Sequence, residues 1–126
     1  MNKIFTLLAA GLLLAGAANL VQASGFATYF ARVTESGGVQ RSSGVADVEN
    51  PAAGIYDVTF TRDVNYCGWM AGLAGTTNPG AGYATVTRAA ATVLRIRTHN
   101  SNGTLVNRAF TVMVQCTCDS AAPGGC

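Results

Sequence analysis

The residues best able to do chemistry in this chain are its four cysteines, Cys67, Cys116, Cys118 and Cys126. Cysteine thiols either bind a metal such as zinc or pair as disulfides, and the redox compartment of the protein decides between the two. Zinc sites commonly use paired Cys-x-x-Cys spacing, whereas Cys116 and Cys118 are separated by a single residue. The spacing favours disulfides, provided that the chain leaves the reducing cytoplasm.

The first 23 residues predict that the chain is exported. Lys3 supplies a positive charge, residues 4–18 form an almost uninterrupted apolar run, and Val21-Gln22-Ala23 ends in a small residue. This order is typical of a secretory signal peptide, and the apolar run is too short for a stable transmembrane helix. We expect cleavage after Ala23, with residues 1–23 as the signal peptide and a secreted product, periplasmic or extracellular.

The remaining chain has no features that predict binding to a membrane or to a nucleic acid. Leu14-Ala15-Gly16 is followed by alanine where a lipoprotein signal would have cysteine, and no later apolar run approaches the roughly 20 residues of a transmembrane helix. Lys3 is the only lysine, so its removal reduces the formal net charge of +2 by one. A nearly neutral surface provides no long-range attraction to nucleic acid or anionic lipid. We expect no nucleic-acid partner and no transmembrane segment in the mature chain.

Short strands separated by turn signals make up the rest of the sequence. Alternation of apolar and polar residues, rich in β-branched and aromatic types, recurs without long helical periodicity. We expect strands at residues 26–34, 39–43, 45–48, 55–60, 66–73, 84–88, 92–98 and 110–116. This pattern predicts an all-β fold, a small antiparallel β-sandwich or jelly roll over residues 24–117, with a flexible, cysteine-containing tail at 118–126.

Three local features refine this expectation. Asn50-Pro51 should end the third strand, because proline lacks the N–H that a β-ladder needs. Asn102-Gly103 predicts a type I′ hairpin between the last two strands, in which both residues take positive φ. Trp69 is expected to anchor the core.

The strand pattern also indicates how the cysteines pair. Cys67 shares a face with Trp69, and Cys116 lies on the apolar face of the last strand, so both should point into the core. We predict a Cys67–Cys116 disulfide, which leaves Cys118 and Cys126 to close a short loop in the tail. The alternative is that the tail cysteines pair between two chains, because a flexible terminus reaches another molecule easily.

Two groups of residues outside the cysteines are candidates for partner binding. Arg95 and Arg97 lie two apart on the polar face of a strand, where they could contact an anionic glycan or a protein. Asn78-Pro79-Gly80 lies in the longest polar loop and could be displayed as a binding or inhibitory loop.

An enzymatic alternative centres on His99, the only histidine. With Ser101 and Asp63 it could form a hydrolase triad, yet no serine lies in a Gly-x-Ser-x-Gly motif. We therefore assign no catalytic, metal-binding or cofactor-binding residue, and expect no cofactor.

Several motifs resemble those of a known group of proteins. The segment 54–60, Gly-Ile-Tyr-Asp-Val-Thr-Phe, is followed by Arg62-Asp63-Val64 and Cys67, with Tyr29–Val33 upstream and Phe110–Cys116 downstream. Together these motifs resemble a recurrent, uncharacterised β domain of bacterial secreted proteins and phage tail or surface proteins. The resemblance implies the β fold, the signal and the Cys67–Cys116 pairing, and it implies no reaction. The Gly-x-Tyr-x-Val-x-Phe strand is also similar to strands of complement-globular and tumour-necrosis-factor jelly rolls, in architecture alone.

These features predict a secreted bacterial structural or interaction module without catalysis. It would self-associate or bind a protein or glycan at the cell surface or in the extracellular matrix. The alternatives are a small secreted hydrolase that uses His99, and a binding or inhibitor module that displays Asn78-Pro79-Gly80.

Overall fold

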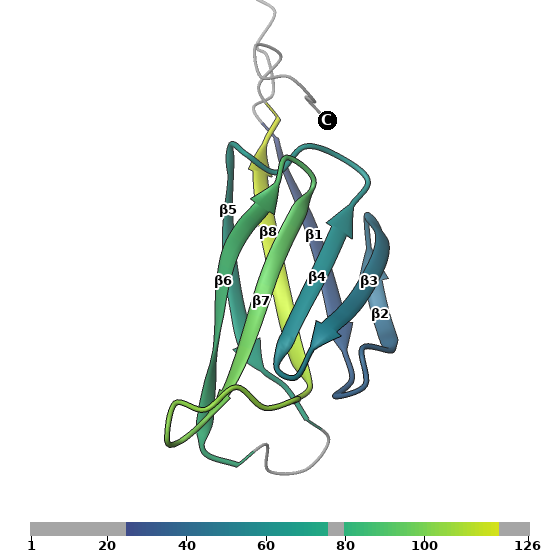
Figure 1. Cartoon of the computed structure of the whole chain (residues 1–126). Coiled ribbons are helices and arrows are strands. Elements are labelled where there is room, and N and C mark those ends of the chain that lie inside the picture. The colour runs from purple at the N-terminus through teal and green to yellow at the C-terminus, as the bar shows by residue number, and fades with distance from the viewer. Residues whose placement is uncertain (1–24, 76–79, 119–126) are drawn as a thin grey trace, which may run out of the picture.

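A computed structural model describes residues 25–75 and 80–118, which form two antiparallel four-stranded sheets packed face to face (Figure 1). Sheet I has the order β2-β1-β8-β5, and sheet II has the order β3-β4-β7-β6. The strands are β1 (Phe26–Val33), β2 (Val39–Ser43), β3 (Val45–Ala52), β4 (Ile55–Phe60), β5 (Cys67–Leu73), β6 (Gly82–Ala90), β7 (Val93–Asn100) and β8 (Phe110–Thr117). The predicted all-β sandwich is confirmed. None of the described residues forms a helix that could span a membrane.

The core lies between the two sheets and follows the alternation in the sequence. Every second side chain of β4, β7 and β8 is buried, because successive residues of a strand point to opposite faces of the sheet. Tyr56 of sheet II and Phe110 of sheet I contact each other across the core, with ring centroids 4.8 Å apart. Burial of each such side chain contributes about 1.5–3 kcal/mol, so the inner faces hold the sandwich together.

Trp69 was predicted to anchor the core, and it packs against the core from its margin without being fully buried. It lies on β5, an edge strand with a hydrogen-bonded neighbour on one side only, and its side chain is half-buried. The indole N–H donates a hydrogen bond to the carbonyl of Val64 at 3.0 Å. The fully buried aromatic residues are Tyr56, Phe60 and Phe110, which come from strands with neighbours on both sides.

The prediction that Asn50-Pro51 ends the third strand is wrong, because β3 continues to Ala52. An edge strand tolerates proline, since one row of its N–H groups has no ladder partner. The register of β3 against β4 also shifts between Glu49 and Ala52, which removes Pro51 from the regular ladder. The Asn50 amide donates to the carbonyls of Ile55 at 2.8 Å and Ala52 at 3.0 Å and so closes the turn into β4.

The predicted type I′ hairpin at Asn102-Gly103 is also wrong. Among the described residues only glycines have positive φ, so Gly103 qualifies at 79° and Asn102 does not. The side-chain oxygen of Asn100 accepts hydrogen bonds from the N–H groups of Asn102 and Thr104, each at 3.0 Å, and this holds the turn. β7 and β8 belong to different sheets, so residues 101–109 cross the end of the sandwich.

The crossing segment is fixed to sheet II by a compact set of hydrogen bonds. The Thr98 hydroxyl, which is fully buried, donates to the carbonyl of Val106 at 2.6 Å, and the Val106 N–H donates back to the Thr98 carbonyl at 3.1 Å. The Gly54 N–H donates to the Asn107 side chain at 2.6 Å. Gly54 has φ of 71°, and a β-carbon there would lie 2.7 Å from the Val106 nitrogen. Glycine is therefore required by both its conformation and its surroundings.

Candidate functional site

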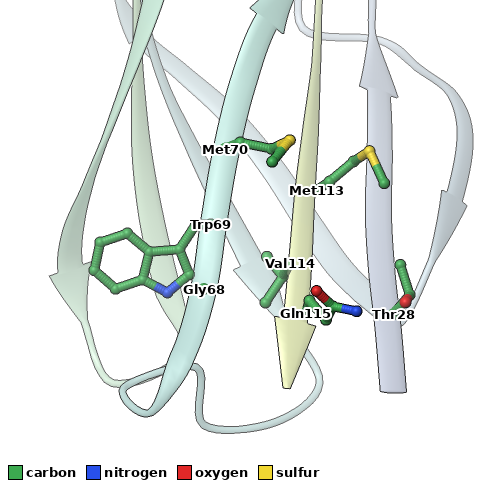
Figure 2. Close-up of a pocket in the computed structure, with 7 residues that line it drawn as sticks. All are labelled: Thr28, Gly68, Trp69, Met70, Met113, Val114 and Gln115. Atoms are coloured by element: carbon green, nitrogen blue, oxygen red, sulfur yellow. The ribbon is translucent and has the colours of Figure 1, made fainter. Parts of the chain in front are cut away.

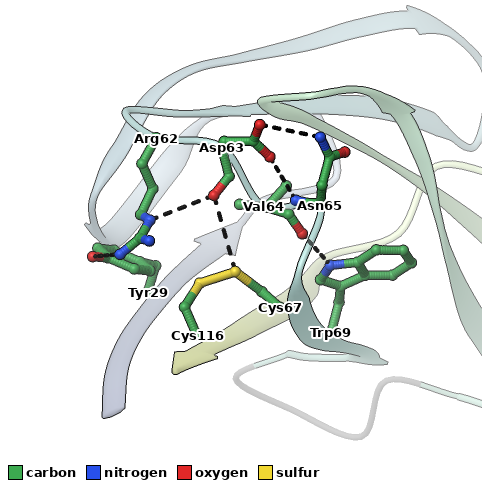
Figure 3. Close-up of a disulfide and its surroundings, with 8 residues drawn as sticks. All are labelled: Tyr29, Arg62, Asp63, Val64, Asn65, Cys67, Trp69 and Cys116. Atoms are coloured by element: carbon green, nitrogen blue, oxygen red, sulfur yellow. Dashed lines mark hydrogen bonds between the residues drawn. A yellow bond between two sulfur atoms is a disulfide. The ribbon is translucent and has the colours of Figure 1, made fainter. Parts of the chain in front are cut away.

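The predicted Cys67–Cys116 disulfide is present and joins β5 to β8 (Figure 3). The two cysteines are directly opposite in the ladder, with Cα atoms 4.3 Å apart. Cys116 is buried, whereas Cys67 is half-buried on the edge strand. The bond therefore fastens the edge of sheet I to its interior rather than joining the two sheets.

The corner beside this disulfide is built by Asp63 and its neighbours. The Asp63 carboxylate accepts hydrogen bonds from the N–H of Asn65 at 2.7 Å and from its side-chain amide at 3.1 Å. The Arg62 guanidinium donates to the Tyr29 hydroxyl at 3.0 Å and lies 5.5 Å from the centre of that ring (Figure 3). These contacts give Asp63 a structural role in the turn between β4 and β5.

His99 and Asp63 are not brought together. Arg97 is opposite Ile55 at the beginning of β4, so His99 lies beyond that end, whereas Asp63 follows Phe60 at the other end. At about 3.3 Å per residue, a whole strand separates them. Figure 1 shows the beginning of β4 and the end of β7 at one end of the sandwich and the end of β4 at the other. The triad considered for a hydrolase is therefore not assembled.

The surroundings of His99 are instead aromatic. Its ring stacks on Tyr83, with centroids 4.5 Å apart and planes 14° from parallel. Its Nδ1 is buried and has no hydrogen-bond partner among the described residues. Ser101 is exposed in the turn that follows β7.

Arg95 and Arg97 lie together on the outer face of sheet II, as predicted, but Arg95 is paired. Its Nε and Nη2 donate to the two carboxylate oxygens of Asp57, both at 2.7 Å. The hydrogen bonds from Arg95 lower the pKa of Asp57, and the same contacts raise the pKa of Arg95. Arg97 donates to the Thr87 hydroxyl at 3.0 Å. Asp57 thus neutralises half of the expected cationic surface.

The structure describes only some of the other predicted site residues. Asn78 and Pro79 lie outside the described residues, and Gly80 lies against the guanidinium of Arg108, which a β-carbon would approach to 2.9 Å. Cys118 is disulfide-bonded, while its predicted partner Cys126 lies outside the described residues. Within residues 25–75 and 80–118, no three His, Cys, Asp or Glu side chains gather where they could hold a metal ion.

Sequence reasoning missed an apolar surface on the outer face of sheet I. Phe26, Met70 and Met113 expose 67%, 65% and 45% of their surfaces, and Met70 is directly opposite Met113 in the ladder. Figure 2 shows the two methionine side chains on adjacent strands beside a shallow hollow of about 250 Å³. The hollow is lined by Thr28, Gly68, Trp69, Met70, Met113, Val114 and Gln115.

The sequence does contain a feature that predicts this surface, namely apolar residues at strand positions that point away from the core. Met70 and Met113 occupy the positions of their strands that point away from the core, where polar residues are usual. Two large apolar residues at outward positions of neighbouring strands could have been noticed only once β5 and β8 were known to pair.

Comparison with protein-family models, curated proteins and solved structures found no match to this chain. The resemblance to the secreted and phage-surface β domain therefore stays a prediction.

Proposed function

We propose that this protein is a secreted bacterial structural or interaction module that works by self-association, without catalysis. The observation that carries the proposal is the exposed apolar outer face of sheet I, where Phe26, Met70 and Met113 point into solvent. Of these, Met70 and Met113 are direct neighbours across the ladder, and exposed apolar side chains that gather in this way are typical of surfaces that bind another protein. The surface reaches the edge of sheet I, because Met70 lies on the edge strand β5, so a second copy can contact it on the face or along that edge.

The opposite face of the sandwich supports this choice. On sheet II the outward side chains contact one another: Asp57 holds Arg95, and Arg97 donates to Thr87. Exposed side chains that are already paired with neighbours contribute little to a new interface. The surface with unused binding capacity is therefore that of sheet I.

The proposed location outside the cytoplasm agrees with the disulfide. Cys67–Cys116 is a structural bond between two strands, and such bonds persist mainly in oxidising compartments. The signal peptide that would deliver the chain there, residues 1–23, lies outside the described residues. The alternative of a displayed Asn78-Pro79-Gly80 loop stays a prediction.

Sedimentation velocity of residues 24–126 over a range of concentrations tests the proposal. We expect a species larger than the monomer to grow with concentration. Met70→Lys, which places a charge on the apolar face at the edge of sheet I, should return the chain to a monomer. Thr87→Lys is the matched control on the outer face of sheet II and should leave association unchanged. A wild-type chain that stays monomeric up to millimolar concentration would overturn the proposal.

A further inference from the structure

Each sheet ends in two edge strands, and three of the four described edges carry features that oppose pairing with another strand. β2 contains Arg41, β3 contains Asp47, Glu49 and Pro51, and β6 contains Arg88. The ladders of all three strands also include a shift in register. Charges, proline and irregularities at an edge are known protections against unwanted strand addition.

β5 is the exception among these edges. Cys67–Leu73 contains no charged residue and no proline, and its seven residues pair with β8 without any shift in register. Cys67 and Cys116 are opposite each other with Cα atoms only 4.3 Å apart, which identifies a non-hydrogen-bonded pair of an antiparallel ladder. Alternation along the strand then directs the backbone N–H and C=O groups of Trp69, Ala71 and Leu73 toward the open edge.

We propose that β5 pairs antiparallel with β5 of a second copy of this chain, about a two-fold axis at Met70. The two four-stranded sheets I become one continuous sheet. This inference rests on the proposed function, because it specifies the route by which the module self-associates.

The register follows from the edge groups and from side-chain size. Hydrogen bonding requires that Trp69, Ala71 and Leu73 face residues of the same parity in the second copy. Centring the pair on Met70 sets Trp69 opposite Ala71 of the second copy and Leu73 opposite Cys67. The Cys67 N–H already donates to the Val64 carbonyl at 3.2 Å, so the new hydrogen bonds centre on Trp69 and Ala71. A shift that centres the pair on Trp69 would oppose two indoles and shorten the ladder.

The outer face of the paired strands accommodates this arrangement. Gly68 would be opposite Gly72 of the second copy, and neither adds a side chain beside the axis. Met70 would contact Met70 of the second copy, and since Met70 is already opposite Met113, a row of methionines would cross the joined sheet. A second copy is favoured over a foreign strand because β5 has no charge to oppose its own, Trp69 lies opposite the small Ala71, and the flexible Met70 side chains can pack on each other.

An engineered cysteine tests the register directly. In residues 24–126 carrying Met70→Cys, the two new thiols would belong to a non-hydrogen-bonded pair with Cα atoms about 4.5 Å apart, a separation that a disulfide can bridge. We expect a covalent dimer on non-reducing electrophoresis, with mass mapping of a link between the two introduced cysteines and an intact Cys67–Cys116 bond.

Gly68→Cys is the matched control for this cross-link. A β-carbon at Gly68 would have the Gln115 carbonyl as its nearest contact, at 4.0 Å, so the substitution fits the fold. In the proposed register the two copies of this position are four residues apart along the ladder, about 13 Å, and no cross-link should form. An associating wild type whose Met70→Cys variant does not cross-link, or cross-links no better than Gly68→Cys, would overturn the register.

A second pair of variants distinguishes association through the β5 edge from association through the outer face of sheet I. Ala71→Pro removes an N–H that points to the open edge and spares the ladder with β8. We expect it to be monomeric at concentrations where the wild type is dimeric, whereas Met113→Lys, one strand further in, stays dimeric. The reverse result would overturn edge pairing and leave the proposed function standing, with the outer face as the contact. A wild type that never associates would overturn both.

Discussion

The two outer faces of this sandwich differ more than the two inner faces do. Inside, both sheets contribute the same alternating apolar side chains to one core. Outside, sheet II carries the Asp57–Arg95 ion pair and the Arg97–Thr87 hydrogen bond, whereas sheet I exposes Met70 and Met113. The apolar inner faces explain why the chain folds. The outer faces differ in function: the side chains of sheet II bond to one another, whereas the exposed methionines of sheet I are available to a partner.

Removing the Cys67–Cys116 disulfide of sheet I should have the largest effect on stability and should affect sheet I more than sheet II. Replacing Cys67 and Cys116 together by alanine should reduce the free energy of unfolding by about 4 kcal/mol, because the bond closes a loop with a sequence separation of 49 residues in the unfolded chain. Urea unfolding of the wild type and the double variant measures the loss. Hydrogen exchange should show β5 losing protection before β4 and β7, whereas equal loss in both sheets would show that the bond supports the whole sandwich.

The buried polar contact of sheet II gives the next largest effect. Thr98→Val keeps the shape of this fully buried side chain but removes the hydroxyl that donates to the Val106 carbonyl. We expect a loss of about 0.5–1.5 kcal/mol in the free energy of unfolding, since one intramolecular hydrogen bond is lost. Thr87→Val is the control, because Thr87 is exposed and its loss should change the stability little. Similar effects of the two substitutions would contradict the role given to burial.

The residues of the inner faces could be predicted from the sequence, because the alternation of apolar and polar residues shows which side chains point into the core. Tyr56, Val58 and Phe60 recur at every second position, and all three are buried. The same parity argument paired Cys67 with Cys116 correctly. It could not tell that they are neighbours within one sheet, because parity fixes which way a side chain points and says nothing of which strand lies beside it.

Features that depend on strand neighbours were not predictable in the same way. Pro51 is accepted because β3 is an edge strand, and no hairpin forms at Asn102-Gly103 because β7 and β8 belong to different sheets. Met70 and Met113 became a surface only when β5 and β8 were placed side by side. Sheet order is a long-range property, so local preference at each residue cannot supply it.

The Asp57–Arg95 ion pair on sheet II should contribute least to the free energy of unfolding, and its contribution should depend on pH. Hydrogen bonds from Arg95 hold the pKa of Asp57 below its ordinary value. A carboxyl whose pKa is depressed by folding stabilises the protein above its unfolded pKa, and this contribution is lost as the pH falls through the folded pKa. The pair is partly exposed, with 36% of the Arg95 side chain accessible, so solvent screens the interaction and the loss should be slight.

Asp57→Asn isolates this contribution from the other acids. The wild type should be slightly more stable than the variant at neutral pH, and the difference should vanish below the ordinary aspartate range, where both side chains are neutral. Urea unfolding of both proteins between pH 7 and about pH 2, the span over which carboxyl groups titrate, measures the difference. If it persists at the acidic end, Asp57 acts through packing rather than charge, and the polar face of sheet II would be held together by contacts that do not depend on its ion pair.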